Sequence, residues 1–289
     1  MLGIRKLTHI THAVRDRTRA EALYLDVFGA RKFHEGALDP QGERCSLLAL
    51  HDLCIRLVEV PDLQAAVEPM VSWRPAEGFH GLGFTVADLD EAALHLEGHG
   101  VRIVRRTPWR LLAHPHDAFG VALEFRREAL PDDPRLQPGW TTEPWARHPL
   151  GLQGLWGITV LVADPAAAQR FCIEVLEARP LMVKVGPEVV RSLIFFTIGD
   201  VPVSVIEPAG PESELTRVTA RLEGGQGVHG VSFLSSRVAE MPQYFRSKGI
   251  GLLASPDSRR VPHPRALMGA RFIFLERPHP DDPRYRRVA

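Results

Sequence analysis

Hydrophobic and polar residues alternate over several short stretches of this chain. After some of these stretches, hydrophobic residues recur every three or four positions, as they do on one face of a helix. The first alternation spans residues 9–14, and Asp16 is a candidate N-cap for a helix that ends at Gly29. Three strand-like runs follow, at 31–34, 46–50 and 54–60. The pattern therefore predicts a strand, a helix and three further strands, in that order.

The same order of elements then begins again. Residues 80–86 alternate, Asp88 is a second candidate N-cap, and residues 92–96 predict a helix. Strand-like runs follow at 101–104 and 121–126. The second half of the chain repeats the pattern from Trp156 and again from His229. We therefore expect an α+β fold with four strand–helix–strand–strand–strand modules, two in each half.

Short motifs of the first half recur in the second half at a constant separation of 149 positions. The pairs are His80-Gly81 with His229-Gly230, His114-Pro115 with His263-Pro264, and Pro131-Asp132-Asp133-Pro134-Arg135 with Pro280-Asp281-Asp282-Pro283-Arg284. Blocks nearer the start of each half match at a separation of 148. So constant a spacing indicates a tandem duplication. We predict two domains, 1–135 and 151–289, joined by a linker at 136–150 where Pro and Gly cluster.

Composition narrows the partners that the chain is expected to have. Lys plus Arg and Asp plus Glu both number 35, so no net charge attracts nucleic acid or anionic lipid. The Arg-rich stretch 102–110 is expected to be solvated surface. The three cysteines show no disulfide framework, and no signal peptide or apolar span is present, so we expect a cytoplasmic protein with a small-molecule partner and with a homodimer possible.

The order of these motifs resembles a known superfamily. A strand beginning with His9, a Val-x-Asp cap, and a helix running from Tyr24 to Gly29 are similar to the vicinal oxygen chelate group of glyoxalases, bleomycin-resistance proteins and extradiol dioxygenases. Residues 78–100 and 114–124 fit its second module, and the latter stretch looks like the end of methylmalonyl-CoA epimerase. The resemblance implies that each pair of βαβββ modules forms a cupped, mixed β-sheet with helices outside.

The resemblance also implies a divalent metal in the first cup. Its ligands would be His9, His80 and Glu124, with Arg56 at the fourth position. Two imidazoles and one carboxylate form a facial set that leaves positions open for substrate or oxygen, and Glu124 sits in an apolar run where an unpaired carboxylate is costly. Arg56 cannot ligate, so it either binds an anionic substrate or faces solvent.

The second cup is expected to be degenerate. His229 matches His80, but Gly157 stands at the place of His9 and Ile273 at that of Glu124. An alternative site across the domains remains open, in which His9 meets His229 and, through a β-bulge, Glu276.

A site with three protein ligands resembles that of the ring-cleaving extradiol dioxygenases. The leading expectation is therefore an Fe(II) enzyme acting on a small aromatic substrate with vicinal oxygens. Those enzymes usually carry the site in the second domain and a Tyr where His114 stands here. His114 is then a candidate acid or base, with His116 and His12 as weaker ones. The alternatives are an isomerase or lyase of glyoxalase or epimerase type, using Ni, Co, Mn or Zn, and a non-catalytic binding protein of resistance type.

Overall fold

A computed structural model describes residues 1–38, 44–60, 77–185, 190–209, 226–255, 258–279, 282 and 284–285. Its first half contains strands β1 Lys6–Val14, β2 Arg31–Ala37, β3 Arg44–Leu50, β4 Leu53–Glu59, β5 Gly78–Thr85, β6 Ile103–Arg106, β7 Arg110–Ala113 and β8 Ala122–Arg126. Its helices are α1 Arg17–Phe28, α3 Leu89–Gly98 and α4 Glu143–Arg147, with 3-10 turns η1 Pro115–Ala118 and η2 Pro134–Leu136.

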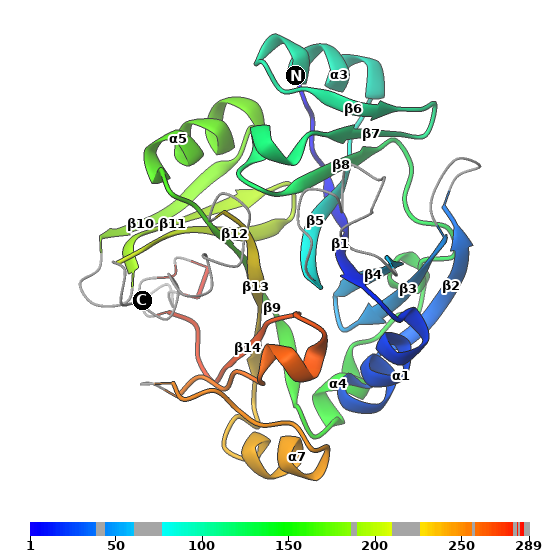
Figure 1. Ribbon diagram of the computed structural model, residues 1–289, viewed down its shortest axis with the longest axis vertical. Coiled ribbons are helices and arrows are strands. Elements are labelled where there is room, and N and C mark those ends of the chain that lie inside the picture. The colour runs from blue at the N-terminus through cyan, green and yellow to red at the C-terminus, as the bar shows by residue number, and fades with distance from the viewer. Residues whose placement is uncertain are drawn as a thin grey trace.

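The second half contains strands β9 Leu152–Leu161, β10 Arg179–Val185, β11 Val190–Ile198, β12 Val201–Pro208, β13 Gly227–Ser235 and β14 Phe272–Leu275. Its helices are α5 Pro165–Arg170, which continues into the π-helical turn η3 Phe171–Val175, and α7 Met241–Ser247, with a 3-10 turn η5 Pro264–Leu267. The strands form two mixed sheets, in the orders β2-β3-β4-β1-β5-β8-β7-β6 and β10-β11-β12-β9-β13-β14 (Figure 1). The expected α+β fold of repeated modules is confirmed.

The helix boundaries follow from the predicted caps. The Asp16 carboxylate accepts from Arg19 N, and Gly29 adopts a left-handed conformation (φ 61°) that closes α1. Asp88 caps α3 in the same way. The fourth module departs from the prediction: between α7 and β14 the described residues form only isolated bridges, such as Arg260 with Phe274, in place of two full strands.

Strand register confirms the duplication residue by residue. In the first sheet Gly83 of β5 lies opposite both His9 of β1 and Glu124 of β8. In the second sheet Ser232, which lies 149 positions later, is opposite Gly157 and Ile273. Gly157 and Ile273 therefore occupy the places of His9 and Glu124, as the sequence predicts.

The repeated Asp-Asp-Pro-Arg motif fastens each first strand. Arg135 donates from Nη2 to the carbonyl of Thr8 at 2.7 Å while it is paired with Asp133. Arg284 donates from Nη2 to the carbonyl of Trp156 at 3.0 Å while it is paired with Asp282. In each half, the arginine of the motif therefore makes the same contact, a hydrogen bond to a backbone carbonyl of the first strand.

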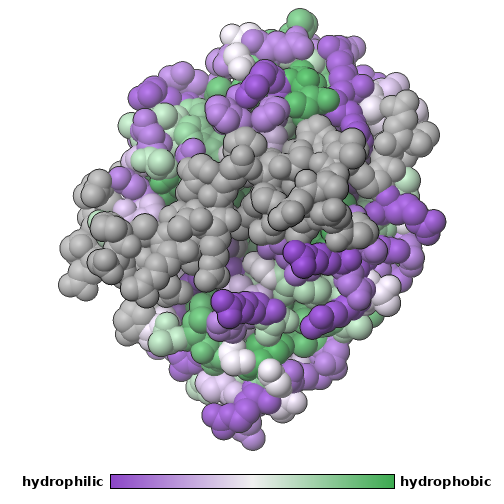
Figure 2. Space-filling model, viewed as in Figure 1, coloured by the Kyte–Doolittle hydropathy of each residue, from purple (hydrophilic) through white to green (hydrophobic). Residues whose placement is uncertain are grey.

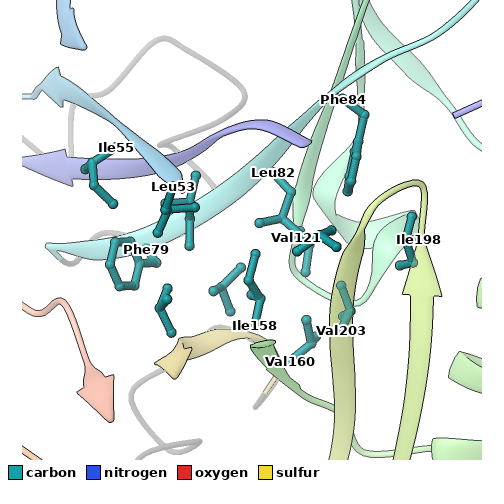
Figure 3. Close-up of a cluster of buried hydrophobic side chains, with 14 of the residues drawn as sticks. Leu53, Ile55, Phe79, Leu82, Phe84, Val121, Ile158, Val160, Ile198 and Val203 are labelled. Carbon is teal, nitrogen blue, oxygen red and sulfur yellow. The ribbon is translucent and has the colours of Figure 1, made fainter. Parts of the chain in front are cut away.

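The two sheets turn apolar faces toward each other. Leu53, Ile55 and Leu82 of the first sheet extend toward Ile158 and Val203 of the second (Figure 3). These side chains are at most 2% exposed, so they form one continuous core with the residues under the helices. Burial of this kind supplies most of the stabilisation of such an interface.

Side chains of different size fill the space beside α1 and the equivalent space beside α5 and η3. On one side Tyr24, Phe28 and Phe272 stack closely, with ring centroids of Phe28 and Phe272 4.6 Å apart. The duplication places Cys172 and Leu176 at the positions of Tyr24 and Phe28. Those smaller side chains line an apolar cavity.

The segment predicted as a linker contains α4 and packs closely against the first domain. Trp145 is 1% exposed, and the Arg31 guanidinium lies 5.3 Å from its ring centroid. In the described part of the chain no helix is both long and apolar enough to cross a membrane. The described surface in Figure 2 is largely hydrophilic, with small hydrophobic areas between polar ones.

Candidate functional site

His9 and Glu124 meet on one face of the first sheet because the strand between them carries glycine. A Cβ atom at Gly83 would lie 2.2 Å from His9 Cε1, so the His9 ring occupies the space above this glycine. His9 is 0% and Glu124 1% exposed. Two of the three predicted ligands are therefore neighbours in the cup.

Glu124 is surrounded by three buried guanidiniums. Its Oε2 accepts from Arg56 Nη1 and from Arg110 Nη1, both at 2.9 Å, and its Oε1 accepts from Arg126 Nη1 at 3.0 Å. These arginines come from β4, β7 and β8 and are at most 4% exposed. Both carboxylate oxygens are thus occupied by charge-assisted hydrogen bonds.

These charges set the protonation states of the cup. Burial alone would raise the pKa of Glu124, but the positive charge of Arg56, followed by the other nearby groups, holds that pKa well below its usual range. Burial lowers the pKa of His9 to about 3, although the Glu124 carboxylate opposes this shift. At neutral pH the carboxyl is therefore ionised and the imidazole is uncharged.

The third predicted ligand does not lie beside the other two. In β5, Gly81 is opposite Thr11 and Phe79 is opposite His12, so His80 is the extra residue of a β-bulge. The positions of β5 that face His9 and Thr11 across the strands are both glycine. Among the described residues, no group of three or more His, Cys, Asp or Glu side chains could hold a metal ion.

The residues present do not fit a divalent cation. A metal ligated by Glu124 would have to displace guanidinium hydrogen bonds from both carboxylate oxygens and remain among three positive charges. The three guanidiniums carry one positive charge each against the single negative charge of Glu124, so the cluster is net positive and repels a dication.

The remaining candidate residues have other contacts. His114 is the N-cap of η1 and accepts from His116 N through Nδ1, and His263 caps η5 identically in the second half. His12 lies 2.9 Å from the Tyr24 hydroxyl and 2.8 Å from the Met268 carbonyl.

The cross-domain alternative gains no support from the described residues. Glu276 follows β14 and is exposed, whereas His9 is fully buried in the first cup. His229 occupies the bulge of β13 that corresponds to His80 in β5.

Residues 8–119 match the model of the Glyoxalase/Bleomycin resistance protein/Dioxygenase superfamily. The match lies within the first domain and covers less than half of the chain. No curated protein sequence matches it. The solved structures similar to it include a mutant of 4-hydroxymandelate synthase from Streptomyces coelicolor, at 12% identity and a TM-score of 0.68, covering 94% of this chain and 92% of that one.

Two dioxygenase structures are also similar in fold. The 2,3-dioxygenase LapB from Pseudomonas sp. KL28 aligns at 16% identity over 96% of this chain and 95% of its own, with a TM-score of 0.60. The 2,2',3-trihydroxybiphenyl 1,2-dioxygenase from Sphingomonas wittichii strain RW1 aligns at 18% identity over 94% and 90%, with a TM-score of 0.59. At these identities the likeness shows that this chain shares their two-domain fold.

Sequence reasoning missed one member of the arginine cluster, Arg110. Arg110 lies in the stretch expected to be solvated surface, yet it is 1% exposed; the expectation is met by Arg102 and Arg106, whose side chains are 59% and 49% exposed. Arg126 carried a signal, because it is two residues from Glu124 and so shares its strand face.

The bulge also left a signal in the sequence. His9 precedes Val14 by five positions, whereas His80 precedes Val86 by six. Aligned on these valines, the residue equivalent to His9 is Gly81 and not His80.

Proposed function

We propose that the first cup of this chain binds a small organic molecule without a divalent metal. One observation carries this proposal: both oxygens of Glu124 accept from buried arginines. The arginines supply the positive charge that a cation would otherwise contribute. Of the functions expected from the sequence, the non-catalytic binding protein therefore has the most support.

The sheet face that carries His9 and Glu124 is otherwise largely apolar. It carries a separate apolar cluster whose members include Ala13, Leu47, Leu112 and Ala122, with Phe33 packed against them. Small-molecule sites are typically apolar with a few polar groups, so the composition of this face supports a small organic ligand. The balanced net charge of the chain gives no support to a nucleic-acid or membrane partner.

The second candidate is the ring-cleaving Fe(II) dioxygenase. It is favoured by the similarity in fold to dioxygenases over nearly the whole chain, and by the pairing of Gly83 with His9 on one side and with Glu124 on the other. It requires Glu124 to exchange its arginines for iron. The isomerase or lyase has less support, since its fourth ligand position is held by Arg56, which is bonded to Glu124.

Metal content and oxygen uptake separate these functions. Protein purified without chelator is analysed for Mn, Fe, Co, Ni and Zn, then incubated anaerobically with Fe(II) and assayed for oxygen uptake with catechols and hydroquinones. We expect substoichiometric metal that is unchanged in Glu124→Gln, and no catechol-dependent uptake. One equivalent of metal that is lost in both His9→Gln and Glu124→Gln would overturn the proposal and favour the dioxygenase.

A further inference from the structure

Arg126 uses one end of its guanidinium for Glu124 and leaves another donor unused. Nη1 donates to Glu124 Oε1 at 3.0 Å, whereas Nε is buried and has no hydrogen-bond partner in the described part of the chain. The Arg126 side chain is 5% exposed, against 1% for those of Arg56 and Arg110. A buried guanidinium N–H without an acceptor is costly, and such a donor marks a place where an acceptor from outside the chain is stabilised.

His9 presents a second unused atom in the same cup. Its Nδ1 lies 2.9 Å from Thr8 Oγ1, while Nε2 is buried with no partner among the residues described. When the Thr8 hydroxyl donates to Nδ1, Nε2 carries the imidazole hydrogen and is a donor.

The charge around these two donors favours an anion. The strongest charge acting on His9 is the Glu124 carboxylate, opposed by Arg56, Arg126 and Arg135, so positive charges outnumber the negative one around this donor. The planar edge of a guanidinium pairs with carboxylate or phosphate oxygens with better geometry than a point charge does. The neighbouring apolar cluster, which includes Leu112 and Phe33, suits a small hydrophobic body attached to the acid group.

Resting on the proposed function, we infer that Arg126 Nε and His9 Nε2 form a subsite for the acid group of a small apolar carboxylate or phosphate. The ligand's oxygen accepts from both donors. Glu124 keeps its hydrogen bonds to the guanidiniums and orients Arg126. No covalent step is involved.

Calorimetric titration of the metal-free full chain tests the subsite with three probes of similar shape: benzoate, phenyl phosphate and neutral benzamide. We expect saturable binding of at least one acid, with benzamide at least 10-fold weaker, because charge-assisted hydrogen bonds are lost. Arg126→Lys retains the charge but lacks the guanidinium edge, and we expect it to weaken acid binding about 10- to 100-fold.

Arg127→Lys is the matched control, since the Arg127 side chain is 54% exposed and paired with Asp88 outside the cup. We expect it to bind the acids as the unaltered chain does, and the thermal transition of each variant shows that it is folded. The inference is overturned if Arg126→Lys folds and binds the acids normally, or if no probe binds. Benzamide binding as tightly as benzoate overturns the acid subsite but leaves metal-free binding standing. Acid binding that appears only after Mn(II) is added overturns the proposed function itself.

Discussion

Replacing Glu124 by Gln removes one charge from the centre of the buried cluster while keeping the shape of the side chain. The three guanidiniums that bond to Glu124 then lose their shared counter-ion inside the protein. Leaving a buried charge without its partner costs about 3–5 kcal/mol. For a chain of this size, 1 kcal/mol lowers the unfolding temperature by about 2–4 °C, so we expect a fall of roughly 6–20 °C.

Differential scanning calorimetry measures this change, with Arg126→Met as the comparison. In Arg126→Met, Glu124 still accepts from Arg56 and Arg110, so the loss is one charge-assisted hydrogen bond, about 1.5–3 kcal/mol. Glu124→Gln should therefore be the more destabilised variant. A fall below about 3 °C in Glu124→Gln, or a rise, would refute the reasoning that the carboxylate holds the arginines together.

Three further changes test other parts of the structure. Gly83→Ala places a Cβ atom 2.2 Å from His9 Cε1 and 2.6 Å from Thr8 Oγ1. We expect the free energy of unfolding, measured in urea, to fall by about 1–3 kcal/mol. An unchanged free energy of unfolding would show that the His9 ring lies elsewhere. Leu176→Phe introduces at the cavity the residue type that stands at the equivalent position, Phe28, in the first half. Because the larger side chain fills the cavity, we expect the melting temperature to rise by a few degrees. A lower melting temperature would mean that the cavity has no room for the ring. Stability should fall on acidification, because the pKa values of both His9 and Glu124 are lower in the folded chain than in the unfolded chain. The unfolded chain takes up the His9 proton below about pH 6.5 and the Glu124 proton below about pH 4.3. Each uptake lowers the free energy of unfolding by about 1.4 kcal/mol per pH unit. His9→Gln should flatten the upper part of that slope, and a slope identical to that of the unaltered chain would contradict the neutral, buried imidazole.

The duplication and most elements could be predicted because they follow from local chemistry. Caps such as Asp16 and Asp88, and alternating runs with turn residues between them, determine helices and strands within a few positions. The incomplete fourth module was not predicted, because its loop forms only bridges although its sequence still resembles the second module.

The composition of the site was less predictable than its location. The structure places His9 and Glu124 opposite the same residue, Gly83, and strand alternation and module order determine this placement. The one-residue bulge at His80 changes which side chains face His9, and such a bulge depends on pairing with a neighbouring strand. Arg110 comes from β7, a strand that no sequence pattern located, so its place beside Glu124 followed only from tertiary structure.

The most direct measurement of what Glu124 binds is anomalous diffraction at the Mn absorption edge, from crystals of the full chain grown with excess Mn(II). We expect no anomalous peak within coordinating distance, about 2.0–2.3 Å, of His9 Nε2 and a Glu124 oxygen, and density in which the three guanidiniums still contact the carboxylate. A peak bound by both residues, with the arginines turned away, would contradict the conclusion that they take the place of a metal.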